Sequence, residues 1–249
     1  MDSKVNKKCE ICGKQYKILS LNIIDIETAD CDCELTKYNE DARREKVLEL
    51  LSNSGIPKKF MNDRLEDWVN VGDNLQMKEV SNRYMRNVIA NFEQGKGILF
   101  AGSVGSGKTR MQCALLKRII SFLAVDGFFV SYDEFSDNLA FDSKSENIKP
   151  FIAKLKSVDV LMFDDFGECE IVKNNRNYLT TLINHRYYEG KVTLFTTMKN
   201  TVELSNIVGD HIVSRVMEMC DTNIVELLNV PDMRKPSNKE KYLNKKGGE

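Results

Sequence analysis

The sequence predicts an α/β protein with a doubly wound, mainly parallel sheet, preceded by a small metal-binding module and a linker helix. Three observations lead to this prediction. Short apolar runs alternate with segments of helical periodicity over most of the chain, a glycine-rich motif follows one of these runs, and an acidic pair follows another. Strands separated by helices in this way are typical of a parallel sheet.

The expected strands and helices follow one another in regular order. Apolar runs predict strands at 97–101, 127–131, 158–163, 192–197 and 223–228. The helical spacing of apolar residues predicts helices at 76–92, 174–188 and 206–219, one that follows residue 109 and one that opens at 132. The succession of strand–helix units is that of an open α/β sheet.

The segment between residues 102 and 109 is the most informative part of the chain. It reads Gly102, Ser103, Val104, Gly105, Ser106, Gly107, Lys108 and Thr109, which matches the pattern G-x-x-x-x-G-K-[ST]. Such glycines let backbone N–H groups close around phosphate oxygens at a helix N-terminus. Lys108 is expected to reach the β- and γ-phosphates of ATP, and Thr109 to offer its hydroxyl to Mg²⁺. A Gly/Ser-rich turn that matches by chance is the alternative, but the strand before the motif and the helix after it favour nucleotide binding.

An acidic pair ends the apolar run 158–163. Asp164 and Asp165 stand at the carboxyl end of this expected strand, which is the edge where open α/β sheets bind their ligands. Asp164 is therefore predicted to hold Mg²⁺ beside Thr109, and Asp165 to orient and deprotonate the attacking water. Alternatively, Asp165 and Gly167 simply form the turn after the strand.

Polar residues also follow the strand predicted at 192–197, which should lie beside the acidic strand. Thr196, Thr197 and Asn200 stand at its end. A side chain here can bridge the γ-phosphate and the attacking water, and Asn200 is the preferred candidate with Thr197 second. As an alternative, both are ordinary caps of the helix that follows.

Arg215 is the remaining candidate for chemistry. An arginine between apolar neighbours on a helix is usually a surface residue that extends its charge into water. Presented to a neighbouring subunit, the same guanidinium stabilises the charge of a transferring γ-phosphate. Both interpretations stay open on the sequence.

Cysteines crowd the N-terminal region in two close pairs. The predicted ligands of a tetrahedral Zn²⁺ site are Cys9, Cys12, Cys31 and Cys33. Between the pairs we expect a small hairpin with strands at 16–18 and 21–26. Free thiols in a flexible leader are the alternative, because the second pair has one intervening residue instead of the usual two.

We expect four parts in the chain. A cysteine-rich module covers 1–35, a linker helix and junction 36–56, the α/β domain 57–235, and a basic tail 236–249. The sequence SNSGIP at 52–57 breaks the linker helix and marks the boundary. Between residues 234 and 246 six basic residues face one acidic residue, and a solvated tail is favoured over a binding surface.

The overall composition narrows the possible functions. With 249 residues and a net charge of −1, the chain is too nearly neutral to coat nucleic acid by bulk attraction, which leaves room for a local basic surface. It contains neither an apolar stretch as long as a membrane span nor a signal peptide, so we expect a cytoplasmic protein without a membrane partner. The scattered cysteines are expected to be small buried apolar residues: Cys113, Cys169 and Cys220.

Taken together, the motifs resemble one known family. The chain contains, in order, the cysteine-rich leader, SGIP at 54–57, GSVGSGKT, LMFDDFG, LINHRYYEGKVTLFTT and DHIVSRVMEMC. This order is similar to that of bacterial or phage replicative-helicase loaders of the DnaC/DnaI type, which are AAA+ ATPases related to IstB. The resemblance covers nearly the whole chain. The phosphate motif and the acidic pair are shared by all P-loop ATPases, whereas the SRVMEM segment and the leader are more particular.

The resemblance implies roles for individual residues. Lys108 and Thr109 resemble the Walker A residues of the family, and Asp164 and Asp165 resemble its Walker B pair, although many AAA+ proteins have Glu at the second position. Asn200 resembles the sensor asparagine. The sequence TMKN at 197–200 departs from the usual Thr-Ser-Asn of that region, so the register is open.

Two arginines and the cysteine-rich leader complete the likeness. Arg215 resembles the arginine finger of the family, and Arg234 resembles an arginine near its C-terminal end that senses nucleotide. The leader resembles the zinc-binding module with which such loaders contact the helicase.

The resemblance implies an ATP-dependent loader that binds a hexameric replicative DNA helicase and places it on single-stranded DNA. ATP would lie at subunit interfaces, with Arg215 supplied by the neighbouring protomer, so that ATP promotes self-association. The closest alternative is an IstB-like transposition helper, against which the cysteine-rich leader counts. Further alternatives are a nucleotide-gated DNA-binding adaptor with little hydrolysis and a small-molecule P-loop kinase, which would leave Arg215 without a role.

Overall fold

The computed structural model describes residues 16–21, 24–29, 33–68, 74–141, 148–168, 176–227, 230–235 and 237. For residues 16–40, 140 and 141 the description covers the backbone alone. The chain divides into two compact units, Met1–Glu49 and Leu50–Glu249. The domain limits expected from the sequence at residues 35, 56 and 235 stay predictions.

The first unit contains a β-hairpin followed by most of a long helix. β1 (Tyr16–Leu21) pairs antiparallel with β2 (Ile24–Ala29), and α1 (Cys33–Ser52) comes next. The sequence pattern placed Leu21 in the second strand, whereas it ends the first. The run contains neither Gly nor Pro to mark the turn, and periodicity alone therefore misplaces it.

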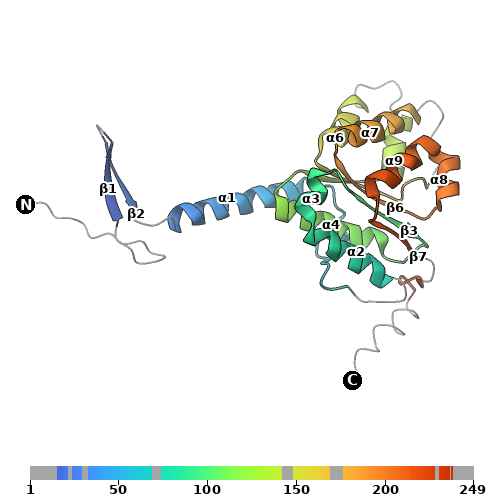
Figure 1. Ribbon diagram of the computed structural model, residues 1–249, viewed down its shortest axis with the longest axis horizontal. Coiled ribbons are helices and arrows are strands. Elements are labelled where there is room, and N and C mark those ends of the chain that lie inside the picture. The colour runs from blue at the N-terminus through green and yellow to red at the C-terminus, as the bar shows by residue number, and fades with distance from the viewer. Residues whose placement is uncertain are drawn as a thin grey trace, which may run out of the picture. The chain divides into compact units, whose positions relative to one another are not determined.

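The second unit is built on a five-stranded sheet (Figure 1). Its strands are β3 (Ile98–Gly102), β4 (Gly127–Ser131), β5 (Val160–Asp164), β6 (Val192–Thr197) and β7 (Ile224–Leu227). Their spatial order is β4-β5-β6-β3-β7, and every neighbouring pair is parallel. The predicted parallel α/β fold is confirmed. β6 lies between β5 and β3, so the strands that carry the acidic pair and the phosphate motif end at the same edge.

The helices of this unit connect the strands. They are α2 (Asn74–Arg86), α3 (Val88–Glu93), α4 (Lys108–Leu123), α5 (Tyr132–Phe141), α6 (Ile148–Ser157), α7 (Arg176–Tyr188), α8 (Thr201–Val208) and α9 (Asp210–Cys220). A short 3₁₀ turn, η1 (Lys58–Phe60), precedes them.

Three features of the helices differ from the prediction. The helix expected at 76–92 is broken at Asn87, which has a non-helical backbone with φ −113° and ψ 24°. The helix expected at 206–219 is divided by Gly209, whose φ of 96° lies outside the helical region and ends α8. Sequence analysis missed α6, because Pro150 obscures its pattern although a proline in the first turn is tolerated.

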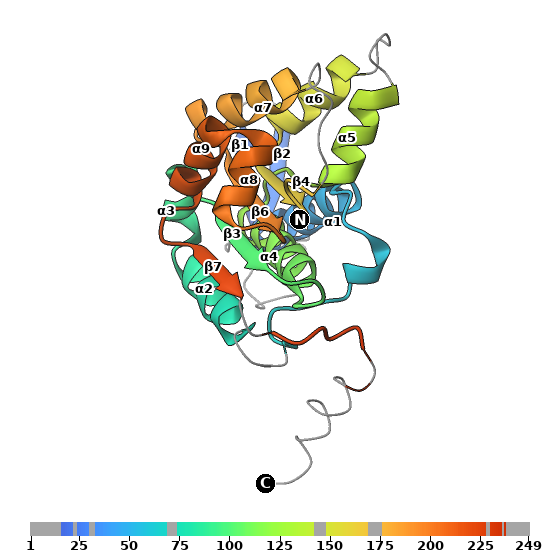
Figure 2. The ribbon, with the colours of Figure 1, turned by 90° about the vertical axis from the view of Figure 1, so that its right-hand side faces the viewer.

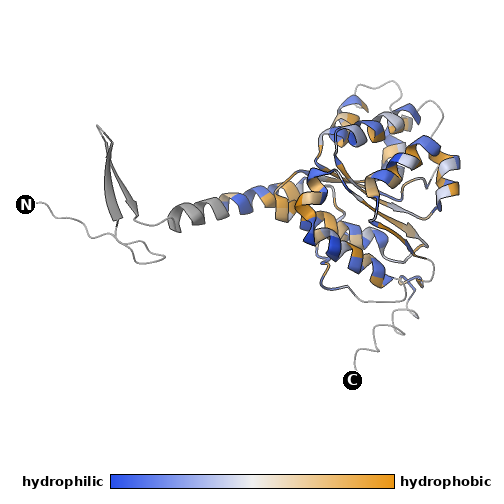
Figure 3. Cartoon of the chain, in the orientation of Figure 1, coloured by the Kyte–Doolittle hydropathy of each residue, from blue (hydrophilic) through white to orange (hydrophobic). Residues whose placement is uncertain are grey.

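Helices cover both faces of the sheet, as Figure 2 shows. On one face, Phe100 and Met162 belong to a buried cluster with α2 and α4, and on the other Leu99 and Phe163 pack with α5 to α9. Neighbouring residues of a strand point to opposite faces, so the strands carry apolar residues on both faces, as the orange strands of Figure 3 illustrate.

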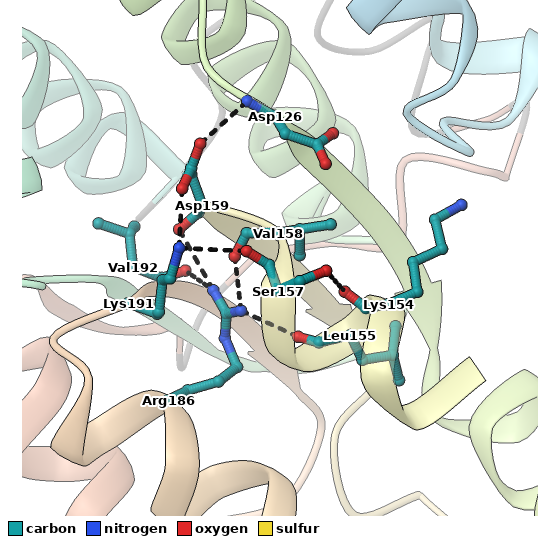
Figure 4. Close-up of polar contacts among 9 residues, drawn as sticks. All are labelled: Asp126, Lys154, Leu155, Ser157, Val158, Asp159, Arg186, Lys191 and Val192. Atoms are coloured by element: carbon teal, nitrogen blue, oxygen red, sulfur yellow. Dashed lines mark hydrogen bonds and ion pairs between the residues drawn. The ribbon is translucent and has the colours of Figure 1, made fainter. Parts of the chain in front are cut away.

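A buried arginine ties together the edge of the sheet opposite the phosphate motif (Figure 4). Arg186 of α7 has no exposed surface. Its guanidinium donates five hydrogen bonds, whose acceptors are the Thr193 hydroxyl and the carbonyls of Leu155, Val158, Asp159 and Val192. Burial lowers the pKa of Arg186 to about 9, so it stays charged at neutral pH. This one side chain joins the end of α6, the starts of β5 and β6, and the last turn of α7.

We expect Arg186→Met to lower the free energy of unfolding by about 3 kcal/mol or more, because it leaves several buried carbonyls without a donor. Urea denaturation followed by circular dichroism measures this loss. The matched control is Arg118→Ala, which removes an ion pair with Glu66 from a side chain that is 56% exposed and should cost less than about 1 kcal/mol. Equal losses in the two variants would contradict the structural role of Arg186.

Candidate nucleotide site

The phosphate motif forms the turn between β3 and α4. Gly105 and Gly107 have φ angles of 76° and 94°, in the region that side chains disfavour. The ring of Trp68 lies against Gly107, and a Cβ on this glycine would be 2.6 Å from the ring. Backbone conformation and close packing therefore both require glycine at this position, and α4 begins at the next residue.

Lys108, the first residue of α4, is 5% exposed and curls back over the loop. Its Nζ donates hydrogen bonds to the carbonyls of Gly102, at 2.7 Å, and Ser103, at 2.9 Å. Burial lowers the pKa of Lys108, and the nearby carboxylates of Asp165 and Asp164 partly offset this effect. The ammonium group is thus held at the carboxyl edge of β3 within the field of the acidic pair.

The segment at 230–235 lies against the phosphate loop. The Ser103 hydroxyl donates to the carbonyl of Val230, at 3.3 Å, and the Met233 N–H donates to the carbonyl of Gly105, at 3.1 Å. The positive charge of Arg234 lowers the pKa values of Lys108 and Asp165. Arg234 is therefore electrostatically coupled to the site.

Asp164 ends β5 as a buried carboxylate with 5% exposure. Burial raises its pKa to about 6, although hydrogen bonds from the hydroxyls of Thr196 and Thr109 lower it. The Thr196 hydroxyl donates to Asp164 Oδ1 at 2.5 Å. The side chains predicted to hold Mg²⁺, Thr109 and Asp164, are therefore in contact.

Asp165 leaves the strand in an unusual conformation. Its φ of 49° lies in the left-handed region, which costs a non-glycine residue about 1–2 kcal/mol. The Asp165 N–H donates to the Thr196 hydroxyl at 2.8 Å, which fixes this turn. Burial raises the pKa of the Asp165 carboxyl, while the charges of Lys108 and Arg234 lower it.

Thr196 is the residue to which sequence analysis assigned no separate role. One hydroxyl of β6 donates to Asp164 and accepts from the backbone of Asp165, so it orients both members of the acidic pair. The role of Thr196 follows from the register of the sheet. Phe163 pairs with Phe195, and this brings Asp164 and Thr196, the residues after them, side by side. This register is not visible in the sequence of either strand alone.

The two sensor candidates take different positions. Asn200 is exposed and caps α8, where its side chain accepts from the Glu203 N–H at 2.9 Å and Glu203 accepts from the Asn200 N–H. The helix-cap interpretation thus describes Asn200 in this structure. Thr197 is buried and donates to the carbonyl of Phe166 at 2.8 Å. A role toward nucleotide stays a prediction for both.

The residues at this edge fit a magnesium-bound nucleotide. Glycine N–H groups, a lysine and a helix N-terminus suit phosphates, and a buried carboxylate with a raised pKa gains stability when a cation lies beside it. The described residues include no cluster of three or more His, Cys, Asp or Glu side chains that could hold a metal. Mg²⁺ commonly binds through one or two carboxylates together with phosphate oxygens, so this site needs no larger cluster.

The comparisons with known proteins agree with this geometry. The family model of the IstB-like ATP binding proteins matches residues 41–227. The chain belongs to this family. It is accordingly an ATP-binding protein, whose nucleotide site is expected at the edge just described. A comparison with curated proteins finds no match.

Several solved structures share the fold of this chain. The DnaC helicase loader is 24% identical, with a TM-score of 0.61, and the match covers 69% of this chain and 99% of that one. DnaI is 21% identical, with a TM-score of 0.60 and coverage of 74% and 98%. The replication initiator DnaA, bound to AMPPCP and single-stranded DNA, is 24% identical, with a TM-score of 0.59 and coverage of 76% and 56%. These similarities place the second unit in the AAA+ P-loop fold.

Two further sequence predictions concern other parts of the chain. Cys9, Cys12 and Cys31 lie outside the described residues, and only the backbone of Cys33 is described, so the zinc site stays a prediction. Among the helices that the structure describes, none has the length and apolar character needed to cross a bilayer.

We expect Asp164→Asn to stabilise the metal-free protein at pH 8 by on the order of 2 kcal/mol. The pKa of Asp164 is raised to about 6, so the native state binds this proton more tightly than the unfolded chain does. The stabilising effect of the proton is fully present below about pH 4 and is lost as the pH rises through 6. The advantage of Asn should therefore shrink between pH 8 and pH 4.

Urea denaturation in EDTA at several pH values measures this difference. Asp67→Asn, at an exposed position, is the control. An Asp164→Asn advantage that does not change with pH would show that the carboxyl is not held in the buried state described here.

Thr196→Val should weaken Mg²⁺-dependent nucleotide binding at pH 7, because it removes a hydrogen bond that lowers the pKa of Asp164. The pH midpoint of this binding, expected near 6 in the wild type, should rise in the variant. Calorimetric titration with a non-hydrolysable ATP analogue between pH 5 and pH 8 gives the midpoint. The exposed Thr201→Val serves as control, and an unshifted midpoint in Thr196→Val would refute the assigned role.

Proposed function

We propose that the protein is an ATP-hydrolysing loader that binds a hexameric replicative DNA helicase and delivers it to single-stranded DNA. The observation that carries this proposal is the convergence of Lys108, Thr109, Asp164, Asp165 and Thr196 at one edge of an AAA+ sheet. This edge has the parts needed to bind a nucleotide and to activate water. The fold is shared with the DnaC and DnaI structures, and this supports a loader.

Each residue at the edge has a distinct task. Lys108 would neutralise phosphate charge, while Thr109 and Asp164 would hold Mg²⁺, which would supply positive charge to stabilise the transferring phosphate. Asp165 accepts a proton from the attacking water, and its raised pKa makes it a stronger base than an exposed carboxylate. The buried Thr196 hydroxyl holds the Asp164 carboxylate and the Asp165 backbone, so both residues are fixed before the nucleotide binds.

Arg215 lies on α9 and would act on the nucleotide of a neighbouring copy. Its guanidinium is partly exposed, and no carboxylate of the described residues forms an ion pair with it. A charge of this kind gains a negatively charged partner when a nucleotide site docks against it, so ATP binding would favour self-association. Loading would then result from a nucleotide-dependent change in the affinity of the subunits for one another and for the helicase.

A second candidate function is supported by the family itself. The matching model is that of IstB-like ATP binding proteins, and a transposition helper would use the same ATPase site. The two functions differ in partner. A loader binds a hexameric helicase through its cysteine-rich leader, whereas a transposition helper binds a transposase and has no use for that module.

Lys108→Ala should abolish ATP turnover, because it removes the ammonium that would neutralise phosphate charge. Release of phosphate by the purified full-length protein, with helicase and single-stranded DNA present, measures turnover. Lys59→Ala, at an exposed position on η1, should retain wild-type rates. Undiminished turnover in Lys108→Ala would rule out the proposed site.

The partner is tested by co-purification from the host lysate. We expect the wild type to retain the replicative helicase, and the double variant Cys9→Ser, Cys12→Ser to lose it while still binding ATP. Retained ATP binding separates loss of the module from general misfolding. Recovery of a transposase without helicase would favour the second candidate, and helicase binding by the double variant would refute the role of the leader.

A further inference from the structure

The guanidinium of Arg215 lies against two tyrosines at the end of α7. It is 5.5 Å from the ring centroid of Tyr187 and 5.3 Å from that of Tyr188. Arg215 also donates a hydrogen bond to the Tyr188 hydroxyl at 3.1 Å. Both ring distances are within the range of about 6 Å at which a cation is attracted to an aromatic face. The two rings contact each other edge to face, with centroids 5.3 Å apart.

This tyrosine pair is built on a rigid support. The residue before it is Arg186, whose five hydrogen bonds hold the last turn of α7 to β5, β6 and the end of α6. Figure 4 shows those to the backbone. Because Arg186 has no exposed surface and is fully hydrogen-bonded, the backbone of the next two residues has little freedom. The backbone beneath this platform of two tyrosines is therefore fixed, and their mutual ring contact and the Tyr187–Glu218 hydrogen bond restrict the rings, whereas a free arginine side chain samples many rotamers.

Tyr187 also binds an acidic residue on the helix of Arg215. Glu218 stands three residues after Arg215 on α9, a spacing at which opposite charges on a helix commonly pair. Here the Tyr187 hydroxyl donates to Glu218 Oε1 at 2.8 Å, and this bond raises the pKa of Tyr187. Because Glu218 is hydrogen-bonded to Tyr187 and forms no ion pair with Arg215 in the described part of the chain, the positive charge of Arg215 stays available for another anion.

The contacts leave the reactive part of Arg215 open. A guanidinium carries five N–H donors on its edges, while its faces interact with aromatic rings. The rings and one hydrogen bond thus fix the group, and the remaining donors stay available for the oxygens of a phosphate. Tyr188 is 71% exposed, so the platform stands at the protein surface, within reach of a second copy.

We propose that Tyr187 and Tyr188 are positioning residues, which hold Arg215 ready to contact the nucleotide bound to a second copy of this chain. This inference rests on the proposed action of Arg215 in trans. The gain arises from preorganisation, since an arginine already fixed in its working geometry loses less entropy when the subunits dock.

Mixtures of variants test this role and separate it from the action of Arg215 itself. Lys108→Ala supplies an intact Arg215 but no working nucleotide site, and Arg215→Ala supplies the converse. Their equimolar mixture should restore about a quarter of wild-type turnover, because random assembly pairs an intact site with an intact arginine at that frequency. No restoration would overturn the trans role of Arg215, and this inference with it.

The tyrosine is then changed on one side at a time. Adding Tyr188→Ala to the Lys108→Ala partner, which donates the arginine, should lower the restored turnover by about fivefold or more. Adding it to the Arg215→Ala partner, which donates the nucleotide site, should leave the restored turnover as in the first mixture. Tyr188→Phe on the arginine side keeps the ring and should recover most of the loss.

The difference between the two placements of Tyr188→Ala separates a positioning role from a structural one. A merely structural effect would lower turnover on both sides, and thermal melts of each variant identify any general loss of stability. If Tyr188→Ala on the arginine side left restoration unchanged, or if both sides fell equally, the positioning role would be overturned while the trans action of Arg215 stood.

Discussion

The nucleotide site depends on one hydroxyl group, that of Thr196 on the strand next to the acidic pair. It donates to the carboxylate of Asp164 and accepts from the N–H of Asp165, whose backbone is in the left-handed conformation. A buried carboxylate is costly unless hydrogen bonds or a cation compensate for it. The protein supplies the hydrogen bonds permanently, and the expected nucleotide-bound Mg²⁺ supplies the charge.

The parallel sheet brings the other parts of the site next to Thr196. β3, β5 and β6 end at the same edge, so the phosphate loop, the carboxylates and Thr196 meet although they lie far apart in the sequence. At the opposite edge, Arg186 fixes the starts of β5 and β6 and the end of α7. The same anchor thus supports the register behind Thr196 and the platform beneath Arg215.

Sequence reasoning recovered the parts of the molecule that have local signals. The strands are apolar runs, and the phosphate motif and the acidic pair are contiguous, so both could be read directly. Thr196 gained its role from strand register, which involves two distant segments. Asn200 has the same side chain whether it senses phosphate or caps a helix, and only the contact with Glu203 shows the cap. The contact of Arg215 on α9 with the tyrosines on α7 depends on how the two helices pack, so the sequence of neither helix predicts it.

The central claim is that the edge of β5 and β6 binds a magnesium-bound nucleotide through Asp164. Calorimetric titration of a non-hydrolysable ATP analogue, with Mg²⁺ and with EDTA, into wild type and Asp164→Asn tests it most directly. We expect Mg²⁺ to tighten binding to the wild type and to give little or no gain in the variant, while binding in EDTA is similar for the two. An equal gain from Mg²⁺ in both proteins would contradict it.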